Sequence, residues 1–154
     1  MVAESIAIIP ARGGSKRIPR KNLAELGGLP LIAWTIKAAL ESKVFSKVLV
    51  STDDEEIAKI SLSYGADVPF LRDTYADDAS SASQATKRAL EQAHQHYGMK
   101  FENVAQLMPN CPLRNSEDIK FAMKAFLNSG GRQQISCAKF GWVNAWWASS
   151  ITED

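Results

Sequence analysis

The sequence contains little cysteine and little histidine. It has two cysteines, Cys111 and Cys137, and two histidines, His94 and His96. Two cysteines cannot by themselves form a disulfide framework or a four-ligand zinc site, so we expect a reducing compartment, the cytoplasm. The two histidines are two positions apart and would point in different directions on a helix, which argues against catalysis by a histidine pair.

The chain also lacks an excess of charge and any long apolar run. Lysine and arginine number 18 and acidic residues 17, which gives a net charge of +1. This balance predicts no general attraction to nucleic acid or to an anionic membrane. No run approaches the ~20 apolar residues of a membrane span, and we expect no secretory signal at the first residues. Partners of both kinds, nucleic acid and membrane, are therefore not expected.

What the sequence does contain is typical of one globular domain. Its 154 residues are 45% hydrophobic and 23% charged. A chain of this length buries roughly 70% of its unfolded surface, which is enough for a single core. We expect one domain over residues 1–154.

Short β-branched runs alternate with segments of helical periodicity. Strands are predicted over Ser5–Pro10, Lys47–Thr52, Asp67–Leu71, Val104–Met108 and Gln134–Ala138. Helices are predicted to carry Leu29, Ile32, Ile36 and Leu40, to run from a cap at Ser51 or Thr52 to near Gly65, and to cover Ala82–Tyr97 and Ser116–Asn128. This alternation favours an α/β fold, a Rossmann-like three-layer α/β/α sandwich with a mostly parallel sheet.

Ligands of such sheets bind beyond the carboxyl ends of the strands, so the loops there are candidate sites. The loop Pro10–Asn22 has two glycines and no acid. Its five cations are Arg12, Lys16, Arg17, Arg20 and Lys21. Gly13 and Gly14 allow close approach of the backbone and positive φ, and free N–H groups beside cations suit a polyphosphate. The alternative is a solvated basic turn; a Walker A motif is absent.

The segment IIPARGGSKRIPRKN, residues 8–22, followed by LGGLPLI, residues 26–32, resembles the opening of the acylneuraminate cytidylyltransferases, the CMP-sialic acid synthetases. The resemblance continues through VSTD at 50–53, YGA at 64–66, Arg72, DASS at 78–81 and PLR at 112–114. It implies a fold of the nucleotide-diphospho-sugar transferase type. It also implies transfer of CMP from CTP to a sialic-acid-like nine-carbon keto sugar acid, with release of pyrophosphate.

The resemblance implies a set of site residues. Arg12 and Lys16 would be the catalytic cations. The CTP-binding residues would be Arg12, Gly13, Gly14, Ser15, Lys16, Asn22, Arg72, Ala79, Ser80 and Ser81. Two alternatives remain open here: Ser81 also suits a helix cap, and Arg72 also suits an ion pair with Asp73 or Asp77.

The segment LMPNCPLR, residues 107–114, departs from the L-Q-P-T-S-P-L-R of the resembling family. Met108 stands where the family has a glutamine that reaches the sugar acid, and Asn110 and Cys111 replace threonine and serine. Met108 and Asn110 are the candidate sugar-acid contacts, and the departure leaves open a related acid of the legionaminic or pseudaminic type. We expect Cys111 to be a buried small residue, and Arg114 either to face the ligand or to balance Glu117 and Asp118.

The resemblance also implies Mg²⁺ and a homo-oligomer, a dimer. No metal ligand is assignable with certainty from the sequence. Asp53 is a weak candidate, beside Asp77 and Asp78, because each also suits a helix terminus or a loop. The family's metal aspartates lie in a C-terminal part that these residues do not include. A non-catalytic nucleotide-binding module and a Kdo-type cytidylyltransferase therefore remain alternatives.

Overall fold

The computed structural model describes residues 4–15, 18–74, 81–130 and 133–137. Three parallel strands form the central sheet in the order β4-β1-β5: β1 is Ser5–Pro10, β4 is Lys47–Ser51 and β5 is Asn103–Gln106. Every residue of β1 is buried. A central parallel strand with both faces covered reads as a continuous apolar run, and this is the pattern of SIAIIP.

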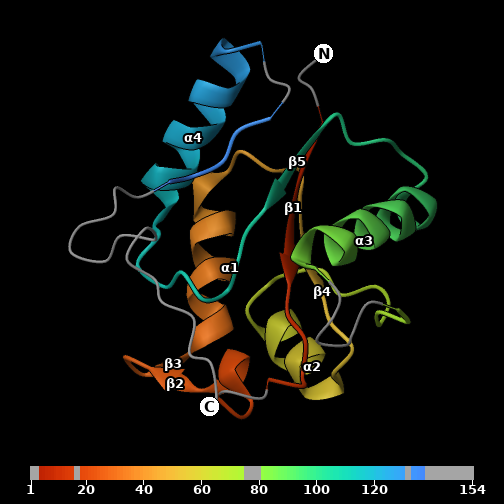
Figure 1. Cartoon of the computed structure of the whole chain (residues 1–154), viewed down its shortest axis with the longest axis vertical. Coiled ribbons are helices and arrows are strands. Elements are labelled where there is room, and N and C mark those ends of the chain that lie inside the picture. The colour runs from red at the N-terminus through yellow and green to blue at the C-terminus, as the bar shows by residue number, and fades with distance from the viewer. Residues whose placement is uncertain (1–3, 16–17, 75–80, 131–132, 138–154) are drawn as a thin grey trace, which may run out of the picture.

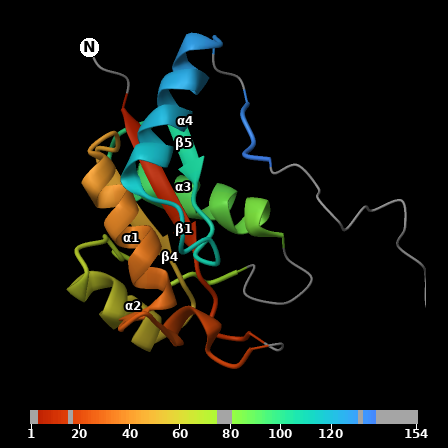
Figure 2. The same ribbon diagram turned by 90° about the vertical axis from the view of Figure 1, so that its left-hand side faces the viewer.

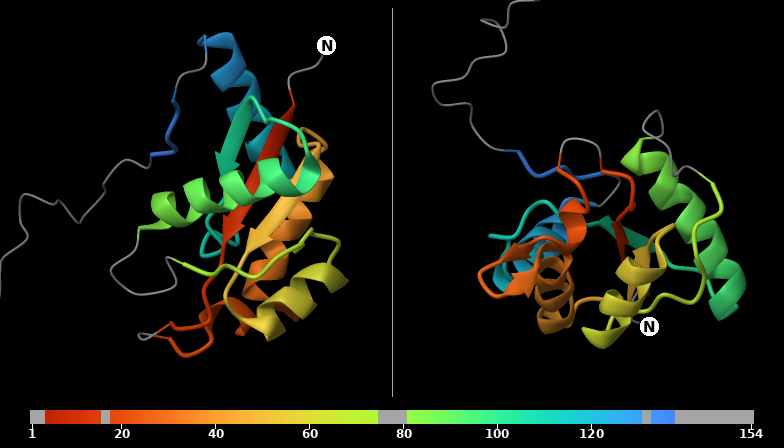
Figure 3. Two further views of the ribbon diagram at one scale, coloured as in Figure 1. Left: turned by 90° about the vertical axis from the view of Figure 1, so that its right-hand side faces the viewer. Right: turned by 90° about the horizontal axis from the view of Figure 1, so that it is seen from below.

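Helices cover both faces of this sheet (Figure 1, Figure 2). On one face, α1 (Leu31–Ser42), α2 (Glu55–Ser63) and α4 (Ser116–Asn128) bury Ile36, Ile57 and Ile119 against the odd-numbered side chains of β1. On the other face, α3 (Ala82–Tyr97) packs Ala89 and Ala93 against its even-numbered side chains. The view from below in Figure 3 shows the strands between these layers. The predicted α/β/α sandwich is confirmed.

The helices over Ala82–Tyr97 and Ser116–Asn128 have the predicted bounds. Capping boxes begin both: Ser81 pairs with Gln84, and Asn115 pairs with Asp118. Each box satisfies two backbone N–H groups that the first turn leaves unpaired. The two helix starts therefore coincide with local capping signals in the sequence.

The predicted third strand is wrong over most of its length. The segment after α2 makes one isolated bridge, Leu49 to Asp67, and then leaves β4. Pro69 has no backbone N–H to continue the ladder, so the chain bulges away there. It returns at Arg72, whose N–H donates to the Thr52 carbonyl at 2.7 Å.

The predicted fifth strand is wrong over residues 134–137, which are not strand; residue 138 lies outside the described residues. The Gln134 side chain donates to the Ala122 carbonyl of α4 at 3.2 Å. This segment therefore lies along the helix instead of adding to the sheet.

The helix predicted around Leu29 begins later, because residues 25–30 form a hairpin of β2 (Glu25–Leu26) and β3 (Leu29–Pro30). Gly27 and Gly28 make its turn with φ of 59° and 81°. Two consecutive positive φ values define a tight hairpin turn that glycine adopts at little cost. A short 3-10 helix, η1 (Lys21–Leu23), precedes the hairpin.

Candidate nucleotide-binding site

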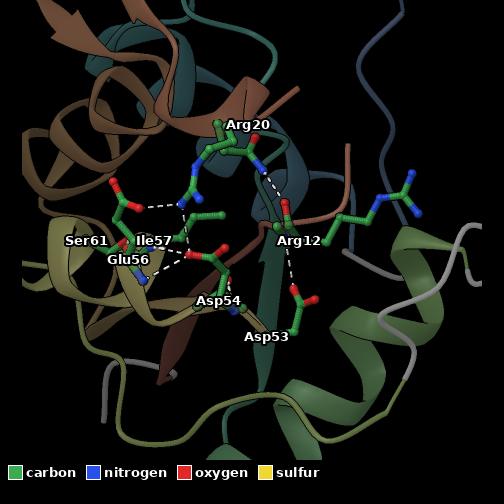
Figure 4. Close-up of polar contacts among 10 residues, drawn as sticks. Arg12, Arg20, Asp53, Asp54, Glu56, Ile57 and Ser61 are labelled. Atoms are coloured by element: carbon green, nitrogen blue, oxygen red, sulfur yellow. Dashed lines mark hydrogen bonds and ion pairs between the residues drawn. The ribbon is translucent and has the colours of Figure 1, made fainter. Parts of the chain in front are cut away.

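The loops after β1 and β4 meet at the carboxyl edge of the sheet. The Ala11 N–H donates to the Ser51 carbonyl at 2.9 Å, and the Gly13 N–H donates to Asp53 Oδ1 at 3.0 Å. Figure 4 shows Arg12 and Asp53 in this cluster, with the Arg12 side chain extending away from Asp54 and Glu56. The structure therefore brings the predicted phosphate loop directly against the strand end that carries Asp53.

Gly13 is required for close approach and not for its backbone angle. Neither Gly13 nor Gly14 has a positive φ, so that part of the prediction is wrong. A Cβ on Gly13 would lie 2.6 Å from Asp54 Oδ2 and 2.9 Å from Asp54 Cβ, whereas one on Gly14 would meet no atom within 4 Å. The Ser15 N–H donates back to the Gly13 carbonyl at 2.9 Å, which tightens the turn.

Asn22 joins the end of the loop Pro10–Asn22 to its beginning. Its side chain is buried, and Nδ2 donates to the Arg12 carbonyl at 3.0 Å. The buried Oδ1 has no hydrogen-bond partner among the described residues. A buried unpaired acceptor is costly, so a ligand hydroxyl or amino group offered there would be bound favourably.

Arg20, another cation of the loop, points to α2. Its guanidinium lies 2.6 Å from Glu56 Oε2 and 3.5 Å from Asp54 Oδ1 (Figure 4). Arg20 adopts a φ of 50°, a conformation that costs a non-glycine residue some strain. Its place in the loop is thus set by the acids of α2 and not directed at the ligand edge.

Asp54, not Ser51 or Thr52, caps α2. Its Oδ1 accepts from the N–H groups of Glu56 and Ile57, each at 2.9 Å. Thr52 instead accepts from the Asp54 N–H at 3.1 Å. Aspartate is among the residues most favoured at a helix N-cap, so the sequence did carry a signal for Asp54 that the prediction of Ser51 or Thr52 missed.

Arg72 pairs with Asp53, and not with Asp73 as one alternative had it; Asp77, the other, lies outside the described residues. Its side chain is 2% exposed, and a terminal nitrogen lies 3.6 Å from Asp53 Oδ1. Burial lowers the pKa of the Arg72 guanidinium, with Asp53 opposing the shift and Arg12 adding to it. The Nε atom is buried without a hydrogen-bond partner among the described residues. Asp73 instead pairs with Arg88 at 2.9 Å.

The loop after β5 has a different character. Arg114 donates to the Met108 carbonyl at 3.0 Å and to Thr35 Oγ1 at 3.2 Å, so it holds the loop against α1. Within the described residues it forms no ion pair with Glu117 or Asp118, although the charge of Asp118 partly opposes the lowering of the Arg114 pKa by burial. Asn110 is exposed and Met108 is half-buried. Cys111 is exposed, so the prediction of a buried cysteine is wrong.

Ser81 caps α3, because its side chain accepts from the Gln84 N–H at 3.2 Å. This use occupies the oxygen as an acceptor and leaves the hydroxyl hydrogen as a donor. The remaining predicted site residues Lys16, Ala79 and Ser80, and the acids Asp77 and Asp78, lie outside the described residues.

Asp53 does not fit a magnesium ligand in this arrangement. The oxygen Oδ1 already accepts from Gly13 and faces the Arg72 guanidinium, whose charge opposes a cation. In the described part of the chain, no three histidine, cysteine, aspartate or glutamate side chains group as a metal site. Within the same residues, no helix has the length and apolar character to cross a membrane.

A family model described as cytidylyltransferase matches residues 6–140. The chain belongs to the cytidylyltransferase family. It is 40% identical over 138 residues to a pseudaminic acid cytidylyltransferase of Campylobacter jejuni, an alignment that covers 89% of this chain and 59% of the relative. It is 41% identical to a CMP-N,N'-diacetyllegionaminic acid synthase of Legionella pneumophila, covering 77% of this chain and 51% of that one. An N-acylneuraminate cytidylyltransferase of Escherichia coli is also 41% identical, over 82% of this chain and 29% of the relative.

Two solved structures share the fold of this chain. A cytidylyltransferase from Leptospira borgpetersenii superposes with a TM-score of 0.65 at 25% identity, covering 84% of this chain and 51% of that chain. A CMP:2-keto-3-deoxy-manno-octonic acid synthetase solved with CTP superposes with a TM-score of 0.67 at 23% identity, covering 83% and 49%, which supports the fold alone. The chain spans about three fifths, 59%, of the length of the first of these cytidylyltransferase relatives.

Proposed function

We propose that the chain binds CTP at the carboxyl edge of the sheet, as the nucleotide-binding portion of a cytidylyltransferase. In this proposal the cytidylyltransferase transfers CMP to a sialic-acid-like nine-carbon keto sugar acid. One observation carries this proposal: in a chain of this family, the basic glycine loop lies against β4 with Gly13, Arg12 and the buried Arg72 at one edge. The relatives named for pseudaminic, legionaminic and N-acylneuraminic acids support the acceptor class.

The reaction is an in-line displacement at the α-phosphorus of CTP. The 2-hydroxyl oxygen of the sugar acid forms the new O–P bond, the bond to the bridging oxygen of pyrophosphate breaks, and the hydroxyl proton passes to solvent. Catalysis of such a step is mostly positioning and neutralisation of charge. Arg12, Ser15 and Lys16 would hold the phosphates, because a guanidinium clamps two oxygens and an ammonium acts as a point charge.

The nucleoside would lie between the first loop and the segment that leads into α3. Asn22 would accept a hydrogen bond through its buried unpaired Oδ1. Arg72, Ala79, Ser80 and Ser81 would complete the base side. Met108 and Asn110 would face the sugar acid, which places an apolar thioether and an amide where the resembling family has glutamine and threonine.

We further propose that Mg²⁺ enters with the substrate as the metal–CTP complex, because Asp53, the described candidate, already accepts from Gly13 and faces the Arg72 cation. A homodimer and a cytoplasmic location belong to the same proposal. The chain of 154 residues is expected to bind CTP but to turn over slowly or not at all, which is the behaviour of the non-catalytic alternative. One observation favours that alternative: Asp53 already accepts from the Gly13 N–H and faces Arg72, so it is not free to bind a metal ion.

Calorimetry with CTP, ATP and GTP tests the binding proposal. We expect CTP to bind most tightly, and equal affinities would remove the base-reading role of residues 79–81. Arg12→Ala should weaken CTP binding by about tenfold or more, because a charge-assisted contact contributes ~1.5–3 kcal/mol. Arg20→Ala serves as the control within the loop, since Arg20 is paired with α2, and it should weaken binding less.

A pyrophosphate-release assay with CTP and a panel of nine-carbon keto acids tests the transfer. Slow or absent formation of a CMP-sugar by the 154-residue chain is the expected result, with one acid preferred where product forms. Rapid turnover by the 154-residue chain itself would contradict the expectation that its metal-binding groups are incomplete.

A further inference from the structure

Asp53 joins the two groups of the site that belong to different loops. Its Oδ1 accepts from the Gly13 N–H at 3.0 Å and lies 3.6 Å from the Arg72 guanidinium. Arg72 is itself fixed by its backbone N–H, which donates to the Thr52 carbonyl at 2.7 Å. One carboxylate oxygen therefore sets where the glycine loop lies relative to the buried guanidinium.

The partner of Asp53 is almost fully buried, whereas Asp53 is not. The Arg72 side chain is 2% exposed and the Asp53 side chain 27%. A buried cation without a counter-charge is strongly disfavoured, and the Nε atom of Arg72 has no hydrogen-bond partner among the described residues. Asp53 thus stabilises Arg72 in a place where one face of the guanidinium still lacks an acceptor.

We propose that Asp53 is a positioning residue for the triphosphate of CTP, acting through the Gly13 amide and Arg72, and that it is not a metal ligand. This inference rests on the proposed function. With the carboxylate in place, the Gly13 loop stays against β4 and the Arg72 guanidinium stays at the edge of the sheet. Without it, the Gly13 loop and the Arg72 guanidinium are free to move before a polyanion arrives, and binding must then restore their arrangement.

Because Asp53 is charged, three possible roles of this residue predict different effects of Asp53→Asn on CTP binding. A carboxylate beside a polyanion repels it, so electrostatics alone predict that Asp53→Asn binds CTP more tightly. A metal-ligand role predicts that Asp53→Asn leaves metal-free CTP binding unchanged and weakens the response to Mg²⁺. The positioning role predicts weaker binding with or without metal, because an asparagine can still accept from the Gly13 N–H but no longer supplies the charge that holds Arg72.

The test is calorimetry of CTP binding to the 154-residue chain and to Asp53→Asn, first in EDTA and then with Mg²⁺. We expect about tenfold weaker binding of the variant in both conditions, the loss of one charge-assisted contact. Asp67→Asn is the matched control. Asp67 is 3.6 Å from Lys47 at the opposite end of β4, so this variant loses an aspartate from an ion pair without touching the loop.

Two further measurements separate positioning from loss of folding. The Asp53→Asn/Arg72→Gln double variant should bind CTP nearly as well as Arg72→Gln, since Asp53 acts in part through Arg72. Hydrogen exchange at the Gly13 amide should speed up in Asp53→Ala and stay at the parent rate in Asp67→Asn. A urea unfolding curve shows whether each variant is folded at the assay temperature.

Tighter or unchanged CTP binding by folded Asp53→Asn overturns the inference, and so does a defect that appears only with Mg²⁺. Failure of the parent chain to bind CTP overturns the proposed function, and with it the role of Asp53 in nucleotide binding. The two failures are distinguishable, because the first requires a parent that binds.

Discussion

Arg72 and Arg114 both lie at the carboxyl edge of the sheet, but their surroundings differ. For both, burial lowers the pKa of the guanidinium, and both have a buried Nε with no hydrogen-bond partner in the described segments. Arg72 faces the carboxylate of Asp53. Arg114 is held by neutral oxygens, the Met108 carbonyl and the Thr35 hydroxyl.

This difference separates Arg72, proposed to bind the nucleotide, from Arg114, which holds two elements of the fold together. Arg114 donates its hydrogen bonds to two elements of the fold, so its cation stabilises the seam between α1 and the loop after β5. The Arg72 guanidinium has a counter-charge nearby, but its side chain makes no hydrogen bond in the described part of the chain, and it lies beside the predicted phosphate loop. This contrast supports the proposal that Arg72 binds the nucleotide, whereas Arg114 stabilises the fold.

The largest expected effect is at Arg114. Arg114→Ala removes two charge-assisted hydrogen bonds that join Met108 and Thr35, so the free energy of unfolding should fall by about 3 kcal/mol. Urea denaturation followed by circular dichroism measures it. CTP affinity of the folded fraction should remain near that of the parent, and a selective loss of CTP binding with normal stability would make Arg114 a ligand residue.

Arg72→Met should have the reverse profile. We expect CTP binding to weaken about thirtyfold, which corresponds to about 2 kcal/mol, while unfolding changes less than in Arg114→Ala. The reason is that, without Arg72, the Asp53 carboxylate still accepts from the Gly13 N–H and, at 27% exposure, still contacts solvent. Calorimetry and urea denaturation of the same preparation give both numbers, and a variant that only unfolds would remove the contrast between the two arginines.

The two glycines of the loop after β1, Gly13 and Gly14, should differ in how much a substitution to alanine lowers stability. Gly13→Ala places a Cβ 2.6 Å from Asp54 Oδ2 and should lower stability by about 1–2 kcal/mol. Gly14→Ala meets nothing within 4 Å and should change stability by less than about 0.5 kcal/mol. Thermal unfolding of the two variants side by side checks the order, and equal midpoints would show that the loop moves away from Asp54 without cost.

The smallest effect is expected at the exposed pair of Asp73 and Arg88. The hydrogen bond from Arg88 is the main cause that holds the pKa of Asp73 below its usual value. Because the folded pKa is the lower one, its contribution is present above the unfolded pKa of about 3.9 and is lost as pH falls through the folded value. In Asp73→Asn, the free energy of unfolding from urea denaturation should lose this small decrease at acid pH. Added salt should weaken the decrease in the parent.

Much of the fold was predictable from local signals. The apolar run of β1 and the capping boxes of α3 and α4 are read within a few residues, and all three elements have the predicted bounds. The hairpin at Gly27-Gly28 carried an equally local signal that was overlooked. The predicted third and fifth strands were wrong because a short local run does not say whether a neighbouring strand edge can be reached, and Pro69 prevents continued pairing in the third.

The candidate site divides in the same way. The sequence alone determined that a basic, acid-free glycine loop follows the first strand, because composition and order along the chain are local properties. Only the tertiary structure decided which charges meet: Arg20 with α2, Arg72 with Asp53, and Arg114 with Thr35 and Met108. These partners are 36, 19, 79 and 6 residues apart in the sequence, and parallel strands bring the distant ones to one edge. Spacing along a chain does not encode such meetings, because they depend on how the sheet and its helices pack.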